Sequence, residues 1–408
     1  MKCRHCGSAV TLCLVDLATS PPSNSYLASQ QMNAPETWYP LRVMVCETCW
    51  LVQTQDYAHH AELFANDYAY FSSFSSTWLE HAGKYVSTMV EQFGLGPESH
   101  VIEVASNDGY LLQYVQKLGI PCLGVEPTAS TARAARAKGI EVIEEFFGVT
   151  LAEQLVARNR GADLTAANNV LAHVPDINDF VAGFARLLKP QGVATFEFPS
   201  LFELVKNCQF DTIYHEHFSY LSLTAVERIF RVNGLSVFDV QQLTTHGGSL
   251  RVFAQRTDTG ARNTEVAVAA MLAAENAAGM SSAAYYAGFQ ERADAVKNSL
   301  LKFLLEQRVL GRSVVAYGAA AKGNTLLNYA GVRADLLHWV IDRNPAKQGK
   351  HLPGSRIPIV EEAQLRREKP DFVVILPWNL VTEVTQQLQY AREWGAKFVT
   401  AIPTLQIQ

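Results

Sequence analysis

The sequence predicts an α/β protein in which a small N-terminal lobe precedes two α/β units. Three observations carry this prediction. The chain has 408 residues, which corresponds to roughly two to three domains of ordinary size. Short apolar strands alternate with helical stretches from about residue 67 to residue 256 and again after residue 298, as expected for parallel, doubly wound sheets. Two CxxC pairs lie ahead of both units.

The composition excludes several classes of protein. The chain is 48% hydrophobic and 18% charged, which excludes a disordered or collagen-like protein. The net charge is −5 and no basic stripe is visible, which argues against nucleic-acid binding. The longest apolar run, residues 266–274, is far shorter than the roughly 20 residues that cross a bilayer. With no signal peptide in view, we expect a cytoplasmic protein with reduced thiols and no membrane partner.

The first segment, residues 1–66, is predicted to fold around a metal. Cys3-x-x-Cys6 and Cys46-x-x-Cys49 each aim two thiolates at one point, and four thiolates close a tetrahedral zinc site. A segment of this size is too small to fold without such a staple. A redox CxxC and a chance pattern are the alternatives, although redox chemistry generally uses one CxxC. Because all four ligands are cysteines, the zinc is expected to be structural.

The second segment, residues 67–260, carries the first α/β unit. We expect helices over residues 78–93, 110–118 and 178–188, and strands over residues 101–105, 122–126, 163–168 and 192–198. Residues 261–297 form an Ala-rich stretch that predicts a helical connector. The alternation restarts over residues 298–408, with strands at 314–317, 337–341, 372–376 and 397–401.

The first strand, turn and helix of the second segment predict a cofactor site. A ligand there meets the carboxyl end of a strand and the start of a helix. Glu126 ends the next strand, 23 residues after Glu103, and a carboxylate there can accept hydrogen bonds from both ribose hydroxyls of an adenosine. Gly109 alone does not make the GxGxxG of a dinucleotide site. S-adenosylmethionine, a nucleoside without phosphates, therefore fits better, with Asn168 and Asn169 lining the same site. A nucleotide-free turn is the alternative.

Two clusters of histidines suggest further chemistry. Tyr214-His215-Glu216-His217 is not HExxH, which excludes that metalloprotease pattern. His215 and His217 would share one face of a strand and, with His173, could ligate a metal. The alternatives are acid–base chemistry, for which histidine is suited near neutral pH, and solvated loop histidines. The run from His246 to Arg251 contains two glycines that allow close approach of a ligand, although a plain turn would need them as well.

The last segment offers two residues for a nucleotide. Lys322 lies in a glycine-bounded turn after a strand, where it could meet a pyrophosphate or remain solvated. The P-loop pattern GxxxxGK[ST] is absent from this turn. Asp342 ends the next strand and could line the same site.

Motifs along the whole chain resemble the nucleotide-sugar C-methyltransferases, which are S-adenosylmethionine-dependent enzymes of deoxysugar biosynthesis. The residues that carry the resemblance are Cys3-Arg4-x-Cys6-Gly7, Ser20-Pro21-x-Ser23-Asn24, Tyr68-x-Tyr70-x-Ser72-Ser73, residues 103–112, Tyr214-His215-Glu216-His217, residues 246–251 and residues 317–324. The likeness runs from residue 3 into the last domain. The Asn107-Asp108-Gly109 form of the cofactor motif is unusual among methyltransferases at large, as is the Tyr-His-Glu-His run.

The resemblance implies three domains and a set of site residues. A zinc-binding N-terminal domain would help to cover the active site, a central class I methyltransferase domain would hold the methyl donor, and a C-terminal Rossmann-like domain would help to hold a dTDP-linked keto sugar. His217 is implied as the base, with Tyr214, Glu216, His173 and Tyr68 around it. The predicted cofactor contacts are Glu103, Ala105, Asn107, Gly109, Tyr110, Leu111, Glu126, Pro127, Asn168 and Asn169. The predicted substrate contacts are Tyr70, Ser72, His215, His246, Lys322, Asn324 and Asp342.

The implied reaction is methyl transfer to C3 of a dTDP-4-keto-6-deoxysugar. The C4 ketone acidifies the C3–H bond, so a histidine can remove the proton, and donors at the ketone oxygen can stabilise the enolate. The alternative is an O- or N-methyltransferase of another small metabolite or sugar, which needs no carbon-acid base. We expect a monomer.

Overall fold

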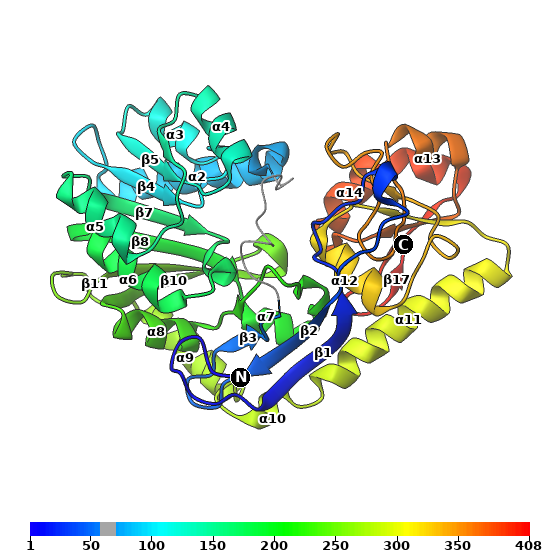
Figure 1. The fold of residues 1–408 in the computed structure, drawn as a ribbon, viewed down its shortest axis with the longest axis horizontal. Coiled ribbons are helices and arrows are strands. Elements are labelled where there is room, and N and C mark those ends of the chain that lie inside the picture. The colour runs from blue at the N-terminus through cyan, green and yellow to red at the C-terminus, as the bar shows by residue number, and fades with distance from the viewer. Residues whose placement is uncertain (58–70) are drawn as a thin grey trace.

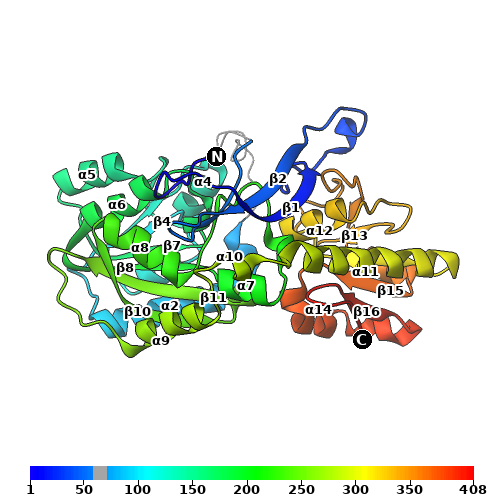
Figure 2. The same ribbon diagram turned by 90° about the horizontal axis from the view of Figure 1, so that it is seen from below.

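The computed structural model describes residues 1–57 and 71–408. Two α/β lobes lie side by side, and the strands of the N-terminal segment run between them (Figures 1 and 2). Each lobe is built on its own sheet, with helices between successive strands. The predicted α/β class is therefore confirmed.

The central lobe has a mainly parallel sheet with the strand order β10-β11-β8-β7-β4-β5-β6. Its strands are β4 (Val101–Val104), β5 (Cys122–Val125), β6 (Val142–Ile143), β7 (Ala162–Asn168), β8 (Leu188–Pro199), β10 (Leu235–Leu243) and β11 (Ser249–Arg256). β11 is antiparallel to both of its neighbours. The chain runs outward from β4 to β6 and then returns to the other side of β4 with β7. A ligand of such a sheet lies at the carboxyl ends of the strands where the order reverses, here between β4 and β7.

The helices of this lobe begin and end where local signals place them. They are α2 (Ser76–Phe93), α3 (Leu112–Lys117), α4 (Ala129–Ala137), α5 (Val149–Ala157), α6 (Ile177–Leu187), α7 (Leu201–Lys206) and α8 (Leu223–Val232). Ser75 caps α2 by accepting a hydrogen bond from the Trp78 amide at 3.2 Å, and Gly94 ends the helix in the left-handed region. The Asp176 carboxylate caps α6 in the same way. The predicted helices 78–93 and 178–188 are thus confirmed, and that over 110–118 starts two residues later.

The C-terminal lobe repeats the α/β plan on a smaller sheet with the order β14-β13-β12-β15-β16-β17. Its strands are β12 (Val314–Tyr317), β13 (Val340–Ile341), β14 (Ile359–Val360), β15 (Phe372–Ile375), β16 (Lys397–Thr400) and β17 (Gln406–Ile407), and its helices are α12 (Ala321–Tyr329), α13 (Ala363–Glu368) and α14 (Val381–Gln387). The strand expected over residues 337–341 is reduced to its last two residues, because only these pair with β12.

The N-terminal strands belong to both lobes. β1 (Leu12–Ser20), β2 (Tyr39–Val45), β3 (Val52–Thr54) and β9 (Ser219–Tyr220) form an antiparallel sheet in that order. Side chains of β1 and β2 share a hydrophobic core with the C-terminal lobe, whereas Cys46, Cys49 and Leu51 pack in the core of the central lobe. The segment is therefore a bridge whose two ends are buried in different cores.

Three helices connect the lobes. These are α9 (Val266–Ala277), α10 (Ala283–Tyr286) and α11 (Phe289–Val309). The Ala-rich stretch is helical as predicted, but α11 continues without a break through the predicted domain boundary at residue 298. Within residues 1–57 and 71–408, no helix combines the length and the apolar character that a bilayer crossing demands.

Candidate active site and zinc cluster

The four cysteines of the two CxxC pairs converge. Their Sγ atoms all lie within 4.8 Å of one another, and the pairs Cys3–Cys49 and Cys6–Cys46 are each separated by 3.5 Å. Four sulfurs around a zinc at about 2.3 Å are about 3.8 Å apart, so this donor set fits a tetrahedral zinc ion. Among the described residues, this is the one group of potential ligands that converges.

Residues of the N-terminal segment, close to the cysteine cluster, form hydrogen bonds with the backbone next to His217. Arg4 lies between the two N-terminal ligands and donates hydrogen bonds to the carbonyls of Phe218 at 3.2 Å and Thr54 at 2.8 Å. The Arg4 guanidinium also lies 4.9 Å from the centre of the Phe218 ring. The Thr54 hydroxyl donates to the carbonyl of His217, and β3 pairs with β9, which begins two residues after His217.

The cofactor turn has the backbone that a close ligand requires. Ala105, Asn107 and Gly109 are left-handed, with φ of 58°, 50° and 76°. The φ of Gly109 favours glycine, and a Cβ there would lie 2.4 Å from Cδ1 of Ile140, so a larger residue would also displace that side chain. The Glu126 carboxylate accepts hydrogen bonds from the amides of Asn107 and Thr128, both at 2.9 Å. Each of its oxygens keeps a lone pair, which a ribose hydroxyl can use.

Hydrogen-bond acceptors that a cofactor could use lie at the same carboxyl edge of the central sheet. Asn168 ends β7, and its Oδ1 is buried without a hydrogen-bond partner in the described part of the chain, as is that of Asn169. Tyr110 lies 3.4 Å from the Asn168 amide. Burial raises the pKa of Glu103 well above its usual range, although the Tyr110 hydroxyl acts in the opposite direction. These groups fit an adenosine cofactor; Leu111 is buried behind them, and Pro127 follows Glu126.

His217 lies in a cluster of aromatic side chains. Its ring centre is 4.6 Å from that of His173 and 4.0 Å from that of Tyr214. Residues 214–217 form a turn, closed by a hydrogen bond from the His217 amide to the Tyr214 carbonyl at 2.9 Å. The common strand face that we considered for His215 and His217 therefore does not form. The amide of Phe218 donates to the carbonyl of Ala172 at 2.8 Å, which ties the turn to the chain that leaves β7.

The histidines of this region are held neutral. Burial lowers the pKa of His173 to about 4, and burial together with Lys322 lowers that of His246 to about 4. Burial and the neighbouring His173 also hold the pKa of His217 well below its usual range. Nδ1 of His217 lies 3.0 Å from the carbonyl of Thr212. Because a carbonyl only accepts, Nδ1 carries the hydrogen and the lone pair of the neutral ring is on Nε2.

The C-terminal lobe contributes a cation to this region. Lys322 is half-buried, donates to Oδ1 of Asn379 at 2.7 Å and lies 4.8 Å from the centre of the Trp378 ring. Trp378 donates from Nε1 to Asp211 at 2.8 Å. Burial raises the pKa of Asp211 to about 6, an effect that Lys322 opposes. Residues from both lobes therefore meet beside His217 and His246.

Other predicted site residues have partners within the protein. His215 turns to the N-terminal lobe, with Nε2 3.3 Å and 3.2 Å from the carbonyls of Tyr39 and Pro40. Both carboxylate oxygens of Glu216 accept hydrogen bonds from Asn24, at 2.9 Å and 2.8 Å.

Three more predicted substrate contacts are engaged in internal hydrogen bonds. Asn324 donates to the carbonyl of Ser23 at 2.6 Å. The Asp342 carboxylate accepts hydrogen bonds from two backbone amides, one of them that of Ala319. The Ser72 amide donates to Asn107 at 2.9 Å, which places Ser72 beside the cofactor turn. Tyr68 and Tyr70 lie outside the described residues.

Sequence reasoning missed several polar residues around the site. Asn379 and Asn24 belong to loops whose place depends on the packing of the lobes. Glu197 offered a signal, because it is the single charge within the apolar residues 192–198 of β8. His81 and Trp78 on α2 stack on each other with ring centres 4.8 Å apart, and Trp78 also contacts His246.

Family models that match successive parts of the chain agree with this arrangement. Family models match residues 3–64 ("Putative zinc binding domain"), 78–240 ("Methyltransferase domain") and 244–403 ("C-methyltransferase C-terminal domain"). C-methyltransferase NovU of Streptomyces niveus is 35% identical over 404 residues, which cover 98% of this chain and 95% of that protein. Ubiquinone biosynthesis O-methyltransferase of Agrobacterium fabrum is 26% identical over 148 residues, which cover 30% of this chain and 58% of that protein. A solved structure of magnesium protoporphyrin IX methyltransferase from Synechocystis PCC 6803 is 15% identical with a TM-score of 0.34, and covers 44% of this chain and 79% of that chain.

The family models, the match to NovU and the geometry together confirm the predicted fold class and the predicted cofactors. The cysteine cluster coincides with the zinc-binding match, and the turn after β4 lies within the methyltransferase match. S-adenosylmethionine and a structural zinc ion are thus the two cofactors, and the chain is a methyltransferase.

The zinc site gives a first testable prediction. Cys46→Ser removes one buried ligand, so we expect purified protein to lose its single zinc ion and its melting temperature to fall by roughly 5 °C or more. Metal analysis and calorimetry measure both quantities. Cys13→Ser is the matched control, because Cys13 is exposed and lies outside the cluster. Wild-type protein without zinc, or a Cys46→Ser protein that keeps it, would contradict the assignment.

Proposed function

Because the chain belongs to the family of C-methyltransferases that includes NovU, we propose that it methylates C3 of a dTDP-linked 4-keto-6-deoxysugar. The observation that carries this proposal is the position of His217. A buried, neutral imidazole with its lone pair on Nε2 lies beside His173 and Tyr214, next to the chain that leaves the cofactor edge at β7. An O- or N-methyltransferase needs no such base, since oxygen and nitrogen already carry a lone pair.

His217 is the proposed base, and its neighbours prepare it. The Thr212 carbonyl fixes the tautomer, so Nε2 carries the lone pair that would accept the proton. His173 and Tyr214 pack against the ring from two directions and leave it few orientations. General-base catalysis of this kind is worth roughly 10²- to 10⁴-fold in rate. Tyr214, His246 or Lys322 can supply a donor or a positive charge to the enolate oxygen that forms.

The methyl donor is assigned to the edge of the sheet between β4 and β7. Glu126 would hold the ribose, and Ala105, Asn107, Gly109, Tyr110 and Leu111 would surround the rest of the ligand together with Glu103, Pro127, Asn168 and Asn169. When bound, S-adenosylmethionine supplies an electrophilic methyl group. The protein's part is to hold C3 and this methyl group in line, because alignment of two reactants supplies a large share of the rate enhancement.

The sugar nucleotide is assigned to the seam between the two lobes. Lys322 is a half-buried cation that suits a diphosphate, and Glu216 can orient a sugar substituent or a histidine. His215, Asn324 and Asp342 are held by internal contacts, so in this arrangement they support the site. Tyr68, Tyr70 and Ser72 remain proposed site residues. A cytoplasmic monomer with boundaries after residues 66, 260 and 297 also remains a prediction.

A turnover assay tests the proposed function. Wild-type enzyme is incubated with S-adenosylmethionine and a panel of dTDP-4-keto-6-deoxysugars, and we expect one of them to gain a methyl group at C3. His217→Asn should lower turnover at least about 100-fold while donor binding stays within about twofold of wild type. His338→Asn is the matched control, because His338 is exposed. A His217→Asn enzyme that turns over normally would exclude His217 as the base.

Solvent exchange separates the proposal from the alternative. In deuterated water, wild-type enzyme should exchange the C3 hydrogen of the keto sugar, whereas His217→Asn should not. Methylation of an oxygen or a nitrogen without exchange at C3 would favour the O- or N-methyltransferase.

The pH profile gives a further prediction. His217 acts as a base only when neutral, and burial holds its pKa below the ordinary value of 6.5. Protonation therefore begins only at lower pH, so the acid limb of kcat/KM should lie below pH 6.5. Initial rates between pH 5 and 8 measure this limb, because kcat/KM reports groups of the free enzyme. A limb centred at pH 7 or above would be inconsistent with a base in this environment.

A further inference from the structure

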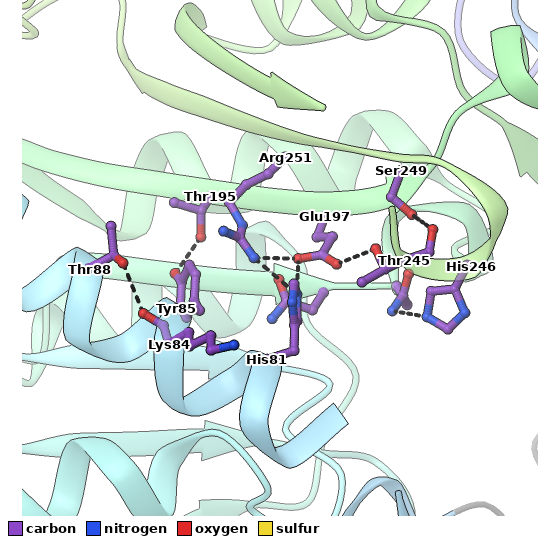
Figure 3. A network of polar contacts seen from close by, with 12 residues as sticks. His81, Lys84, Tyr85, Thr88, Thr195, Glu197, Thr245, His246, Ser249 and Arg251 are labelled. Atoms are coloured by element: carbon purple, nitrogen blue, oxygen red, sulfur yellow. Dashed lines mark hydrogen bonds and ion pairs between the residues drawn. The ribbon is translucent and has the colours of Figure 1, made fainter. Parts of the chain in front are cut away.

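A buried polar network lies behind the loop that carries His246, and the proposed chemistry uses none of its central members (Figure 3). Glu197 on β8 is fully buried and is the direct cross-strand partner of Arg251 on β11. Arg251 donates to Oε2 of Glu197 at 2.7 Å, and Nε2 of His81 lies 2.9 Å from the same oxygen. Because a carboxylate only accepts, His81 donates this hydrogen bond.

Glu197 is ionised in this network. Burial alone would raise its pKa, but the hydrogen bond from His81 and the charge of Arg251 hold the pKa below its usual range. Arg251 is itself held over the Tyr85 ring, 4.7 Å from its centre, and the Tyr85 hydroxyl lies 2.6 Å from that of Thr195. Burying a carboxylate this deeply carries a large desolvation cost. An apolar side chain of similar volume would fill the same space in the core without that cost.

The remaining contacts of Glu197 point toward the site. Its second carboxylate oxygen accepts a hydrogen bond from the Thr245 hydroxyl at 3.0 Å, and Thr245 directly precedes His246. Its main-chain carbonyl accepts from the amide of Asn169 at 2.7 Å. Nδ2 of Asn169 lies 3.2 Å from Nε2 of His246. Glu197 thus holds both members of the Asn169–His246 pair, each through a different group.

Both members of this pair have a backbone conformation that needs support. Asn169 and His246 are left-handed, with φ of 53° and 54°, a conformation that is unfavourable for a residue with a side chain. Such conformations persist where the surroundings fix them. The carbonyl of Thr245 accepts from the Gly248 amide and the Ser249 hydroxyl, both at 2.9 Å, so the Thr245 anchor closes the whole turn.

We propose that Glu197 is a positioning residue for methyl transfer, which acts through Thr245 and Asn169 to fix His246 at the substrate face of the cofactor site. The effect on turnover rests on the proposed function, whereas the anchoring of the loop does not. Loss of the anchor lets His246 turn away from the keto sugar. A misplacement of about 1 Å can lower a rate about 100-fold.

The sharpest test removes the hydrogen bond from Thr245 to Glu197 and keeps the contacts of Glu197 with Arg251 and His81. Glu197→Gln would leave Arg251 without its counter-charge, so the variant of choice is Thr245→Val, which keeps the shape of a half-buried side chain and deletes the hydroxyl. Thr245→Ser restores the hydroxyl. Thr244→Val is the matched control, because Thr244 is the exposed neighbour in the same turn. Hydrogen exchange of the Gly248 amide, binding of S-adenosylhomocysteine and the kinetics with the keto sugar are measured for each variant.

We expect Thr245→Val to accelerate exchange at Gly248 and to lower kcat/KM for the sugar about 10- to 100-fold, with the affinity for S-adenosylhomocysteine unchanged. Thr245→Ser should recover most of the rate, and Thr244→Val should stay within about twofold of wild type. If the Gly248 amide of Thr245→Val exchanges at the wild-type rate, Thr245 does not anchor the loop. Faster exchange at Gly248 together with wild-type kinetics would show that the anchor does not contribute to methyl transfer. Loss of S-adenosylhomocysteine binding would show that the hydrogen bond has only a structural role. A wild-type enzyme that methylates none of the sugars would refute the proposed function, while the exchange result still decides the anchor.

Discussion

The pairing of β3 with β9 is the contact on which the proposed active site depends. β9 has two residues, and a ladder this short is marginal in water. It persists because Arg4, between two zinc ligands, donates to the carbonyl of Thr54 at the end of β3 and to that of Phe218, the residue just before β9. One side chain thereby joins the cysteine cluster to Phe218, the residue after His217, and to Thr54, whose hydroxyl donates to the His217 carbonyl.

Burial shapes the electrostatics of the site. His173, His217 and His246 are neutral because desolvation disfavours the imidazolium. When a neutral imidazole removes a proton from a neutral carbon acid, a cation and an anion form side by side and the net charge of the buried region does not change. Lys322 supplies the standing positive charge, and Asp211 lies close enough to moderate it. Proton transfer is therefore possible in a region that would resist an isolated charge.

The sequence was sufficient for those features that depend on local pattern. The strands 101–105 and 122–126 and the helix 178–188 were predictable because apolar periodicity and a capping Asp176 mark them. The four cysteines were predictable as one cluster because zinc imposes its own geometry. The turn at His215 was not predictable from the sequence, since its form depends on the carbonyls of Tyr39 and Pro40, which are remote in sequence.

The role of Glu197 was hidden for a related reason. A charge in an apolar strand signals a buried partner, but the partner is fixed by the register between β8 and β11. Arg251 could be paired with Glu197 only once that register was known. The same holds for Asn324, whose partner Ser23 is supplied by the N-terminal segment.

The run from Asp211 to His217 shows why the chain needs three parts in contact. It has little regular secondary structure, so its polar groups must find partners elsewhere. The C-terminal lobe supplies Trp378 to Asp211 and the Thr325 hydroxyl to the carbonyl of Ile213 at 2.7 Å. From the N-terminal lobe, the Asn24 side chain donates a hydrogen bond to the Glu216 carboxylate, and the Thr54 hydroxyl donates one to the His217 carbonyl. A Cβ on Gly247 would lie 2.4 Å from Trp378, so the same tryptophan also packs directly on the His246 loop. His217, the proposed base, thus lies at a junction that no single domain could form, and its position is a property of the assembled chain.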